Sequence, residues 1–376
     1  MDADTAEPAA TGRSRRRDVS EVVGMPALPP PALASWADRV RAAVAALHRS
    51  LAPPPVQVLE GLFGMLDNAV LGALCHLEIP DRLDGPVPVA ELARQVDADD
   101  DVVHRLVAYA AGRGWLRLDR RGRARPTRTT RFLRRDHPGG WRAWVEFTTG
   151  AEVTAAVAHL GREPRLPDPF AAANGASFFD WQAAHPDRHQ AFDAAMAAGG
   201  RLHGLTLAAA VDWSGDARVC DVGGGTGALL RVLLDRHPHL HGVLADLPQV
   251  VARAPAHPRL EAVGSDAFAG LPPGCDTYLF VNVLHDWDDD AAVRLLGHVV
   301  PAGGDGTRAI VVEGEHRAGG HDTITARTDV LMLALAPGGR ERSRAEFARL
   351  ATRAGLGLRR TVRLASGDVA HVMGAS

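Results

Sequence analysis

The stretch Val219-Cys220-Asp221-Val222-Gly223-Gly224-Gly225-Thr226-Gly227 indicates how the C-terminal half of the chain folds. Four residues of strand character run into a loop that contains four glycines, and a helical pattern begins at Ala228. Without Cβ atoms, such a loop can turn tightly and let a ligand approach the backbone closely. A glycine loop between a strand and a helix is typical of a site for a nucleotide-type cofactor.

Strand patterns alternate with helical patterns on both sides of this loop. Strands are predicted at 218–222, 242–245, 260–263, 277–283, 309–312, 358–364 and 369–373, and helices at 228–236, 289–300 and 344–355. This alternation predicts an α/β fold with a mostly parallel sheet covered on both faces. Ligands of such sheets bind at the carboxyl ends of the strands.

An acidic residue supports the cofactor site. The second predicted strand ends at Asp246, 19 residues after Gly227, where a carboxylate can bind both hydroxyls of a ribose. Gly223, Gly225 and Ala228 also satisfy the relaxed G-x-G-x-x-A pattern of dinucleotide binding. The loop and the acid therefore predict a nucleoside cofactor but leave NAD(P) open as a candidate.

The composition excludes several classes of chemistry. The chain has no lysine, so its 42 basic residues are all arginine, which excludes Schiff-base chemistry and a Walker-type phosphate loop. The net charge of −3 argues against a general binder of nucleic acids or membrane surfaces. Three scattered cysteines, none in a Cys-x-x-Cys pair, fit a reducing cytosol and support neither a disulfide framework nor a zinc site.

The N-terminal part begins with a Pro-, Ala- and Arg-rich segment, residues 1–34, which we expect to be a disordered extension. An amphipathic helix follows from Trp36 to Leu51, and Pro53-Pro54-Pro55 ends it. The stretch 62–77 is apolar nearly all round, which predicts a buried helix. No uninterrupted apolar run reaches the ~18 residues that a membrane-spanning helix needs.

Residues 87–135 have the order of a winged helix: a short helix at 89–93, an acidic turn at 97–101, a helix at 102–112 and a hairpin around 120–123. Nine arginines lie between Arg117 and Arg135 and could contact the phosphates of DNA. The helices lack the usual Asn, Gln or Lys side chains that read bases. A dimerisation scaffold is the favoured interpretation, and a ligand-sensing DNA-binding regulator remains an alternative.

Two further features suggest a catalytic pocket. Residues 140–205 are helical in pattern and hold eight of the 19 aromatic side chains (Phe, Trp and Tyr) of the chain; these either pack a core or line an apolar substrate site. His285 follows the fourth predicted strand and stands before Asp286-Trp287-Asp288-Asp289, on the same sheet edge as the glycine loop. This placement favours a catalytic role for one histidine out of 17.

Five motifs in order carry a resemblance to a known family. They are Asp221–Gly227, Ala245-Asp246-Leu247-Pro248, Ser265-Asp266-Ala267-Phe268, His285-Asp286-Trp287 and Pro337-Gly338-Gly339-Arg340-Glu341-Arg342. Together they resemble the small-molecule S-adenosylmethionine-dependent O-methyltransferases of the plant caffeate and flavonoid type and of bacterial polyketide tailoring. The resemblance covers about residues 36 to 376, so only the N-terminal extension lies outside it.

The resemblance implies a Rossmann-like class I methyltransferase domain with a mostly parallel seven-stranded sheet, preceded by a mainly α winged-helix dimerisation domain. The expected units are 35–137 for dimerisation, 138–205 as a helical connector lining the substrate pocket, and 206–376 for catalysis. The implied activity is methylation of a hydroxyl on an aromatic small molecule in specialised metabolism. We expect a cytoplasmic homodimer that uses S-adenosyl-L-methionine, with no metal, nucleic acid or membrane as a partner.

The resemblance also assigns roles to residues. His285 matches the general base, and Glu313 and Glu341 match the acids that flank it. The cofactor would contact Gly223, Gly224, Gly225, Asp246, Leu247, Asp266, Ala267, Phe268 and Asn282. The substrate would contact Phe147, Phe179, Trp181, Met196, Asp286 and Met332. Val281 stands where the plant enzymes commonly have a lysine, so part of the cofactor contact differs here.

The chemistry explains these residue types independently of the family. A phenol with a pKa of about 10 is mostly neutral at pH 7, so a histidine within hydrogen-bond reach can take its proton as the methyl group transfers. A carboxylate beside the histidine orients the ring and stabilises the imidazolium. Family members that keep the cofactor fold but catalyse hydroxylation or pericyclic reactions remain an alternative.

Overall fold

The computed structural model describes residues 29–160, 168–316 and 324–375. A seven-stranded sheet organises the C-terminal part in the order β6-β5-β4-β7-β8-β10-β9. The strands are β4 (Arg218–Val222), β5 (His241–Asp246), β6 (Leu260–Gly264), β7 (Thr277–Val281), β8 (Arg308–Glu313), β9 (Leu356–Arg363) and β10 (Val369–Ala375). The first five run parallel, and β10 is antiparallel to both of its neighbours. The predicted fold class is confirmed.

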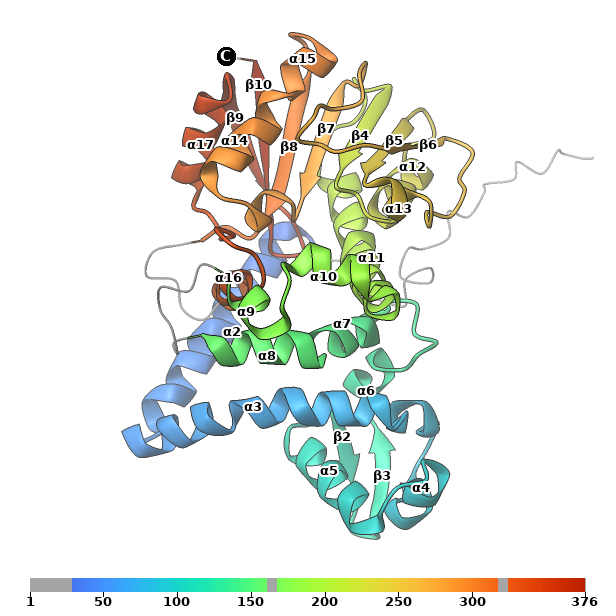
Figure 1. Cartoon of the computed structure of the whole chain (residues 1–376). Coiled ribbons are helices and arrows are strands. Elements are labelled where there is room, and N and C mark those ends of the chain that lie inside the picture. The colour runs from blue at the N-terminus through green and yellow to red at the C-terminus, as the bar shows by residue number, and fades with distance from the viewer. Residues whose placement is uncertain (1–28, 161–167, 317–323, 376) are drawn as a thin grey trace, which may run out of the picture.

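Helices cover both faces of this sheet (Figure 1). They are α12 (Ala228–Arg236), α13 (Pro248–Val251), α14 (Asp289–Gly297), α15 (Val299–Gly303) and α17 (Arg344–Arg353). One face packs Phe280, Leu295 and Phe347 in a core cluster, and the other packs Trp213, Leu233 and Leu279. The helix predicted at 228–236 is confirmed, whereas the one predicted at 289–300 ends at Gly297 and a second helix begins at Val299.

A layer of helices lies beside the carboxyl ends of the parallel strands (Figure 1). It contains α7 (Trp141–Thr148), α8 (Ala151–His159), α9 (Pro169–Asn174), α10 (Phe178–Ala184), α11 (Pro186–Ala210) and α16 (Ile324–Leu335). The boundary expected between residues 205 and 206 falls inside α11, so one continuous helix joins this layer to the sheet unit. The helical character predicted for 140–205 is confirmed in the described residues.

The small N-terminal unit has the predicted element order. It contains η1 (Ile79–Arg82), β1 (Val87–Pro88), α4 (Val89–Gln95), α5 (Asp100–Gly112), β2 (Leu116–Leu118), β3 (Arg123–Pro126) and α6 (Arg128–Phe132). Asp99 caps α5 by accepting hydrogen bonds from the backbone N–H groups of Asp101 and Val102. The three strands form a sheet in the order β1-β3-β2.

Several arginines of this unit are held in ion pairs. Arg123 and Arg125 both contact Asp119, with N–O distances of 2.9 and 3.2 Å. Arg134 bridges Asp84 and Asp136. Because acidic side chains already engage these guanidinium groups, the hairpin presents fewer free charges to phosphates than its sequence suggests, which favours the scaffold interpretation.

Two long helices precede this unit, α2 (Pro31–Leu51) and α3 (Pro54–His76). The amphipathic helix is confirmed, although it begins at Pro31, inside the segment expected to be disordered. The prediction of a buried helix over 62–77 is wrong for most of its length, because only Val70, Leu74 and Cys75 of α3 are buried. The N-terminal turns of α3 extend past the small unit (Figure 1), and their large apolar side chains are exposed.

Large apolar side chains therefore lie on the surface of both helices. On α2 they are Leu33, Trp36, Val40, Val44, Leu47 and Leu51, and on α3 Val56, Val58, Leu59, Leu62, Phe63, Met65 and Leu66. By length and composition alone, α3 is also apolar enough to cross a membrane. Contiguous apolar surface of this extent marks a contact with a partner or a membrane.

Candidate functional site

The glycine loop follows β4 and opens α12 as expected. Gly223, Gly225 and Gly227 all adopt positive φ angles, of 67°, 59° and 75°, a conformation that other residues adopt only under strain. The Asp246 carboxylate at the end of β5 accepts hydrogen bonds from the backbone N–H groups of Gly225 at 2.8 Å and of Leu247 at 2.7 Å. The tertiary structure thus connects the loop and the acid that the sequence separates by 21 residues.

The loop leaves room for a ligand at Gly225 and none at Gly224. A Cβ added to Gly225 would meet no atom within 4 Å, whereas one on Gly224 would lie 2.6 Å from the Asp221 carboxylate and from the Leu244 side chain. Gly224 is therefore required for packing, and Gly225 borders open space beside Asp246. Burial raises the pKa of Asp246, and each of its oxygens retains a lone pair that can accept a ribose hydroxyl. These residues fit a nucleoside cofactor.

The predicted adenine side of the site lies after β6. Asp266 accepts a hydrogen bond from the backbone N–H of Phe268 at 2.9 Å, and Ala267 and Phe268 pack against the core of the sheet. The Phe268 ring meets Trp287 edge to face with centroids 4.8 Å apart, and the Arg294 guanidinium lies 5.0 Å from its centroid. Trp287 belongs to the His285-Asp286-Trp287 motif, but no role was predicted for it from the sequence.

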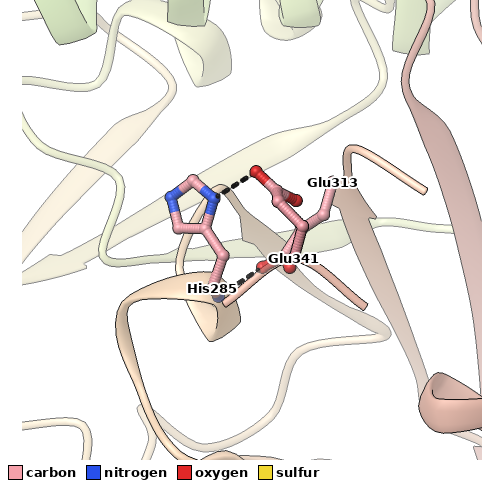
Figure 2. Close-up of side chains that lie close together, drawn as sticks. All are labelled: His285, Glu313 and Glu341. Carbon is pink, nitrogen blue, oxygen red and sulfur yellow. Dashed lines mark hydrogen bonds and ion pairs between the residues drawn. The ribbon is translucent and has the colours of Figure 1, made fainter. Parts of the chain in front are cut away.

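His285 stands in the short helix η2 (Leu284–Asp286), directly after β7. Asn282, the residue after that strand, has a positive φ of 53° and donates its backbone N–H to the carbonyl of Val312. Glu313 ends the neighbouring strand β8, and Glu341 lies in the segment before α17. Figure 2 shows the imidazole and the two carboxylates gathered at one point.

The two glutamates contact different parts of His285. The Nδ1 atom of the ring lies 3.3 Å from Glu341 Oε1, and Glu313 Oε1 accepts the backbone N–H of His285 at 3.0 Å (Figure 2). Both glutamates are buried. A carboxylate oxygen can only accept a hydrogen bond, so Glu341 favours the neutral tautomer that carries its proton on Nδ1. In that tautomer Nε2 has the free lone pair. Nε2 lies 3.6 Å from Asp286 Oδ1.

The three carboxylates determine the protonation of the site. Burial by itself lowers the pKa of His285, but Asp286, Glu341 and Glu313 more than offset this and raise it to about 10. Burial raises the pKa of Asp286 to about 6 and that of Glu313 to about 7. The site therefore retains protons more strongly than the same groups would in water.

Two contacts of Glu341 were not predicted. The hydroxyl of Thr328, on α16, donates to Glu341 Oε1 at 2.9 Å, and Asp329 accepts the backbone N–H of Glu341 at 2.7 Å. No local pattern in the sequence pointed to either residue, because 13 positions separate Thr328 from Glu341. The expected absence of a metal ion from the site stays a prediction.

An apolar cluster in the helical layer contains four of the predicted substrate contacts, Phe147, Trp181, Met196 and Met332. Phe170, Phe178, Phe192, Leu331 and Leu335 pack with them. Phe178 and Phe192 each meet Phe147 edge to face, with centroids 6.2 and 5.3 Å apart. Much of the aromatic concentration is thus a packed core, the first of the two interpretations of this segment.

Phe179 does not join this cluster. Its ring is partly exposed and stacks on Trp287, with centroids 6.2 Å apart and an angle of 17° between the planes. Phe179 therefore faces the aromatic side chains near the predicted adenine site, whereas its neighbour Phe178 points into the cluster. Adjacent residues of a helix point about 100° apart, which accounts for the difference.

Comparison with known proteins identifies relatives of the chain. The O-methyltransferase domain family matches residues 151–357. The chain is 35% identical over 243 residues to the mitomycin biosynthesis 6-O-methyltransferase of Streptomyces lavendulae; the alignment covers 62% of this chain and 64% of that enzyme, less than two thirds of its length. It is 32% identical to the 2,7-dihydroxy-5-methyl-1-naphthoate 7-O-methyltransferase of Streptomyces carzinostaticus, over 80% of this chain and 92% of that enzyme.

A solved structure resembles most of the chain. It is an O-methyltransferase of neocarzinostatin biosynthesis, in complex with S-adenosyl-L-homocysteine and 1,4-dihydroxy-2-naphthoic acid. The TM-score is 0.70 at 29% identity, and the match covers 85% of this chain and 98% of that one. The resemblance therefore includes the N-terminal unit as well as the sheet.

Proposed function

The chain belongs to the O-methyltransferase family, and from this premise we propose that it transfers a methyl group from S-adenosylmethionine to a hydroxyl of an aromatic small molecule, with His285 as the general base. The observation that carries the proposal is the contact between His285 Nδ1 and Glu341 Oε1 at 3.3 Å, at the same sheet edge as the glycine loop. One relative is named for mitomycin biosynthesis and another for a dihydroxynaphthoate acceptor, which supports a hydroxylated aromatic acceptor and a role in specialised metabolism.

His285 performs the proton transfer in this proposal. Glu341 orients the ring through Nδ1, so Nε2 can accept the proton of the acceptor hydroxyl. Glu313 fixes the backbone of His285 and adds negative charge that stabilises the imidazolium once it has formed. His285 must first be neutral, and the carboxylates that raise its pKa make this deprotonation the condition for each turnover.

The cofactor contacts come from the loop and the two acids after β5 and β6. Asp246 would hold the ribose, Asp266 with Phe268 would frame the adenine, and Gly223 and Gly225 would border the methionine part. S-adenosylmethionine supplies a methyl group on a positively charged sulfonium. The open space at Gly225 and the spare lone pairs of Asp246 support this assignment.

The acceptor site would lie between η2 and the helical layer. Asp286 faces it with a carboxylate whose nearest recorded partner is His285 Nε2 at 3.6 Å, so it can accept a hydrogen bond from a second donor on the acceptor. Met196 and Met332 would supply flexible apolar contacts. A planar hydroxylated aromatic fits a wall of this kind.

Two measurements on His285→Ala test the function. In this variant we expect kcat to fall about 10²- to 10⁴-fold, because the base is removed. The acceptor is the best one from a panel of phenols and hydroxynaphthoates. Affinity for S-adenosylhomocysteine, measured by calorimetry, should stay within about twofold. A wild-type protein that binds NADH in place of S-adenosylhomocysteine would refute the cofactor assignment, and an unchanged kcat would refute the role of His285.

We propose further that the enzyme is a homodimer in which α2 and α3 contact the partner subunit. Thirteen large apolar side chains of these helices are exposed, and a second copy would bury them. A standard interface buries about 800 Å² per partner, and these two helices offer an apolar surface for such a contact. A cytoplasmic location agrees with this arrangement and stays a prediction.

A further inference from the structure

The hydroxyl of Thr328 has one proton and two recorded acceptors. Its Oγ1 lies 3.0 Å from the backbone carbonyl of Thr325, one turn earlier in α16, and 2.9 Å from Glu341 Oε1. A threonine in a helix often donates to such a carbonyl. A hydrogen bond to an ionised carboxylate is roughly twice as strong as a neutral one, so an ionised Glu341 takes the proton.

The oxygen concerned is the one that faces His285. Glu341 Oε1 contacts both the Thr328 hydroxyl and the imidazole Nδ1, whereas Glu341 Oε2 is buried and has no partner among the described residues. The two donors therefore share a single oxygen. The hydrogen bond from Thr328 therefore reduces the negative charge that this oxygen presents to the imidazole ring.

We propose that Thr328 is a positioning residue for His285, which acts through Glu341: its hydroxyl donates to the carboxylate oxygen that faces the imidazole and weakens the hold of that carboxylate on the imidazolium proton. A hydrogen bond to the charged form of an acid favours that form and disperses its charge. The neutral imidazole that a general base requires then becomes more accessible. The catalytic consequence depends on the proposed function, whereas the effect on the ring does not.

The other charged groups around the ring make their recorded contacts with atoms other than Nδ1. Asp286 lies at Nε2, and Glu313 accepts the backbone N–H of His285. The guanidinium of Arg342, the residue after Glu341, donates to Asp289 and to the carbonyls of Leu284 and Trp287. Asp329 accepts the backbone N–H of Glu341 and so fixes the main chain. Among the recorded contacts, only Thr328 donates to the side chain of Glu341 from outside the ring.

The first test follows the ring directly and needs no acceptor substrate. Full-length protein with labelled histidine ring carbons is titrated by NMR with S-adenosylhomocysteine present, and the resonance missing in His285→Gln identifies His285. In Thr328→Val we expect the pKa of His285 to rise by about half to one unit, since one hydrogen bond of ordinary strength is removed. Thr328→Ser, which keeps the hydroxyl, should restore the wild-type value.

A matched control separates this effect from a loss of helix structure. Thr352 on α17 also donates to a carbonyl one turn earlier, at 3.0 Å, and no carboxylate contact is recorded for it. Thr352→Val should leave the His285 titration unchanged. An unchanged titration in Thr328→Val would overturn the inference, whether or not the variant loses activity.

The second test uses turnover on the best phenol of the panel. Because His285 must be neutral, its higher pKa in Thr328→Val should shift the acid limb of the kcat–pH profile to higher pH by the same half to one unit. At pH values below the pKa, kcat should therefore be about three- to tenfold lower than in wild type. A uniform loss of kcat at every pH would overturn the inference. If His285→Ala is fully active, the proposed function fails, and the NMR result still decides the effect of Thr328 on the ring.

Discussion

Glu313 Oε1 accepts the backbone N–H of His285 at 3.0 Å, while the imidazole of the same residue lies against Glu341. Two buried glutamates from distant parts of the chain thus hold the main chain and the side chain of one histidine separately. This division gives the two acids different functions, although a family resemblance assigns them the same one.

The division predicts different losses for the two acids. Glu341→Gln removes the negative charge at Nδ1, which lowers the pKa of His285 and leaves its imidazolium less stabilised. We therefore expect kcat on its alkaline, pH-independent plateau to fall by about 10- to 100-fold, the effect of one lost charge-assisted contact. Glu313→Gln keeps an oxygen for the backbone N–H and should lose less than about tenfold. Steady-state kinetics on one acceptor measure both variants. Equal losses would contradict the division.

Turnover should increase with pH. Burial lowers the pKa of His285, but the surrounding carboxylates raise it to about 10, so the neutral base becomes more abundant as the pH rises from neutral to alkaline values. We expect kcat to rise between pH 7 and pH 9 in wild type, as determined with saturating substrates. A profile that is flat across this range would contradict the assignment of His285 as the group that must lose a proton.

Stability should change in the opposite direction. The folded state raises the pKa of Asp286 to about 6, of Glu313 to about 7 and of His285 to about 10. All three therefore bind protons more tightly when folded, so their contribution to the free energy of unfolding falls as pH rises across this range. In denaturant unfolding without cofactor, the free energy of unfolding should be lower at pH 9 than at pH 6. In Glu313→Gln this difference should be smaller by about 1 kcal/mol or more. A decline of the same size in that variant would refute the contribution of Glu313.

The glycine loop allows binding and folding to be separated. Gly225→Ala places a methyl group in open space at a φ of 59°, so we expect a stability loss of about 1 kcal/mol but a fall in affinity for S-adenosylhomocysteine of more than tenfold. Gly224→Ala collides with Asp221 and Leu244 and should destabilise the fold more. Asp246→Asn should weaken cofactor binding about 10- to 100-fold, since hydrogen bonds to a charged group are lost. Unchanged affinity in Gly225→Ala and Asp246→Asn would place the cofactor elsewhere.

The exposed face of α3 predicts the oligomeric state. Val58, Leu62 and Met65 are exposed to 62%, 62% and 74% and lie on one side of the helix. We expect the wild type to be a dimer in light scattering and Leu62→Asp to be a monomer, while Glu60→Gln, an adjacent polar change, stays dimeric. Wild-type protein that is monomeric and sediments with vesicles would contradict the dimer and favour a membrane contact for α3.

The sequence by itself determined those features of the fold and of the site that depend on the spacing of neighbouring residues. The strand and helix periods from Arg218 to Met373, the glycine loop and the acidic turn at 97–101 are properties of neighbouring residues, so their patterns could be read directly. The order of the strands placed Asp246, His285 and Glu313 at one sheet edge, because parallel strands end on the same side.

Only the tertiary structure decided the contacts that depend on packing between distant elements. Periodicity shows that Leu62–Leu77 is apolar, but whether its side chains are buried depends on which elements cover them, and most of α3 is exposed. The direction of Phe179 toward Trp287 and the hydroxyl of Thr328 on Glu341 likewise follow from how α10 and α16 pack on the sheet. These contacts join residues from different elements, so no local spacing encodes them.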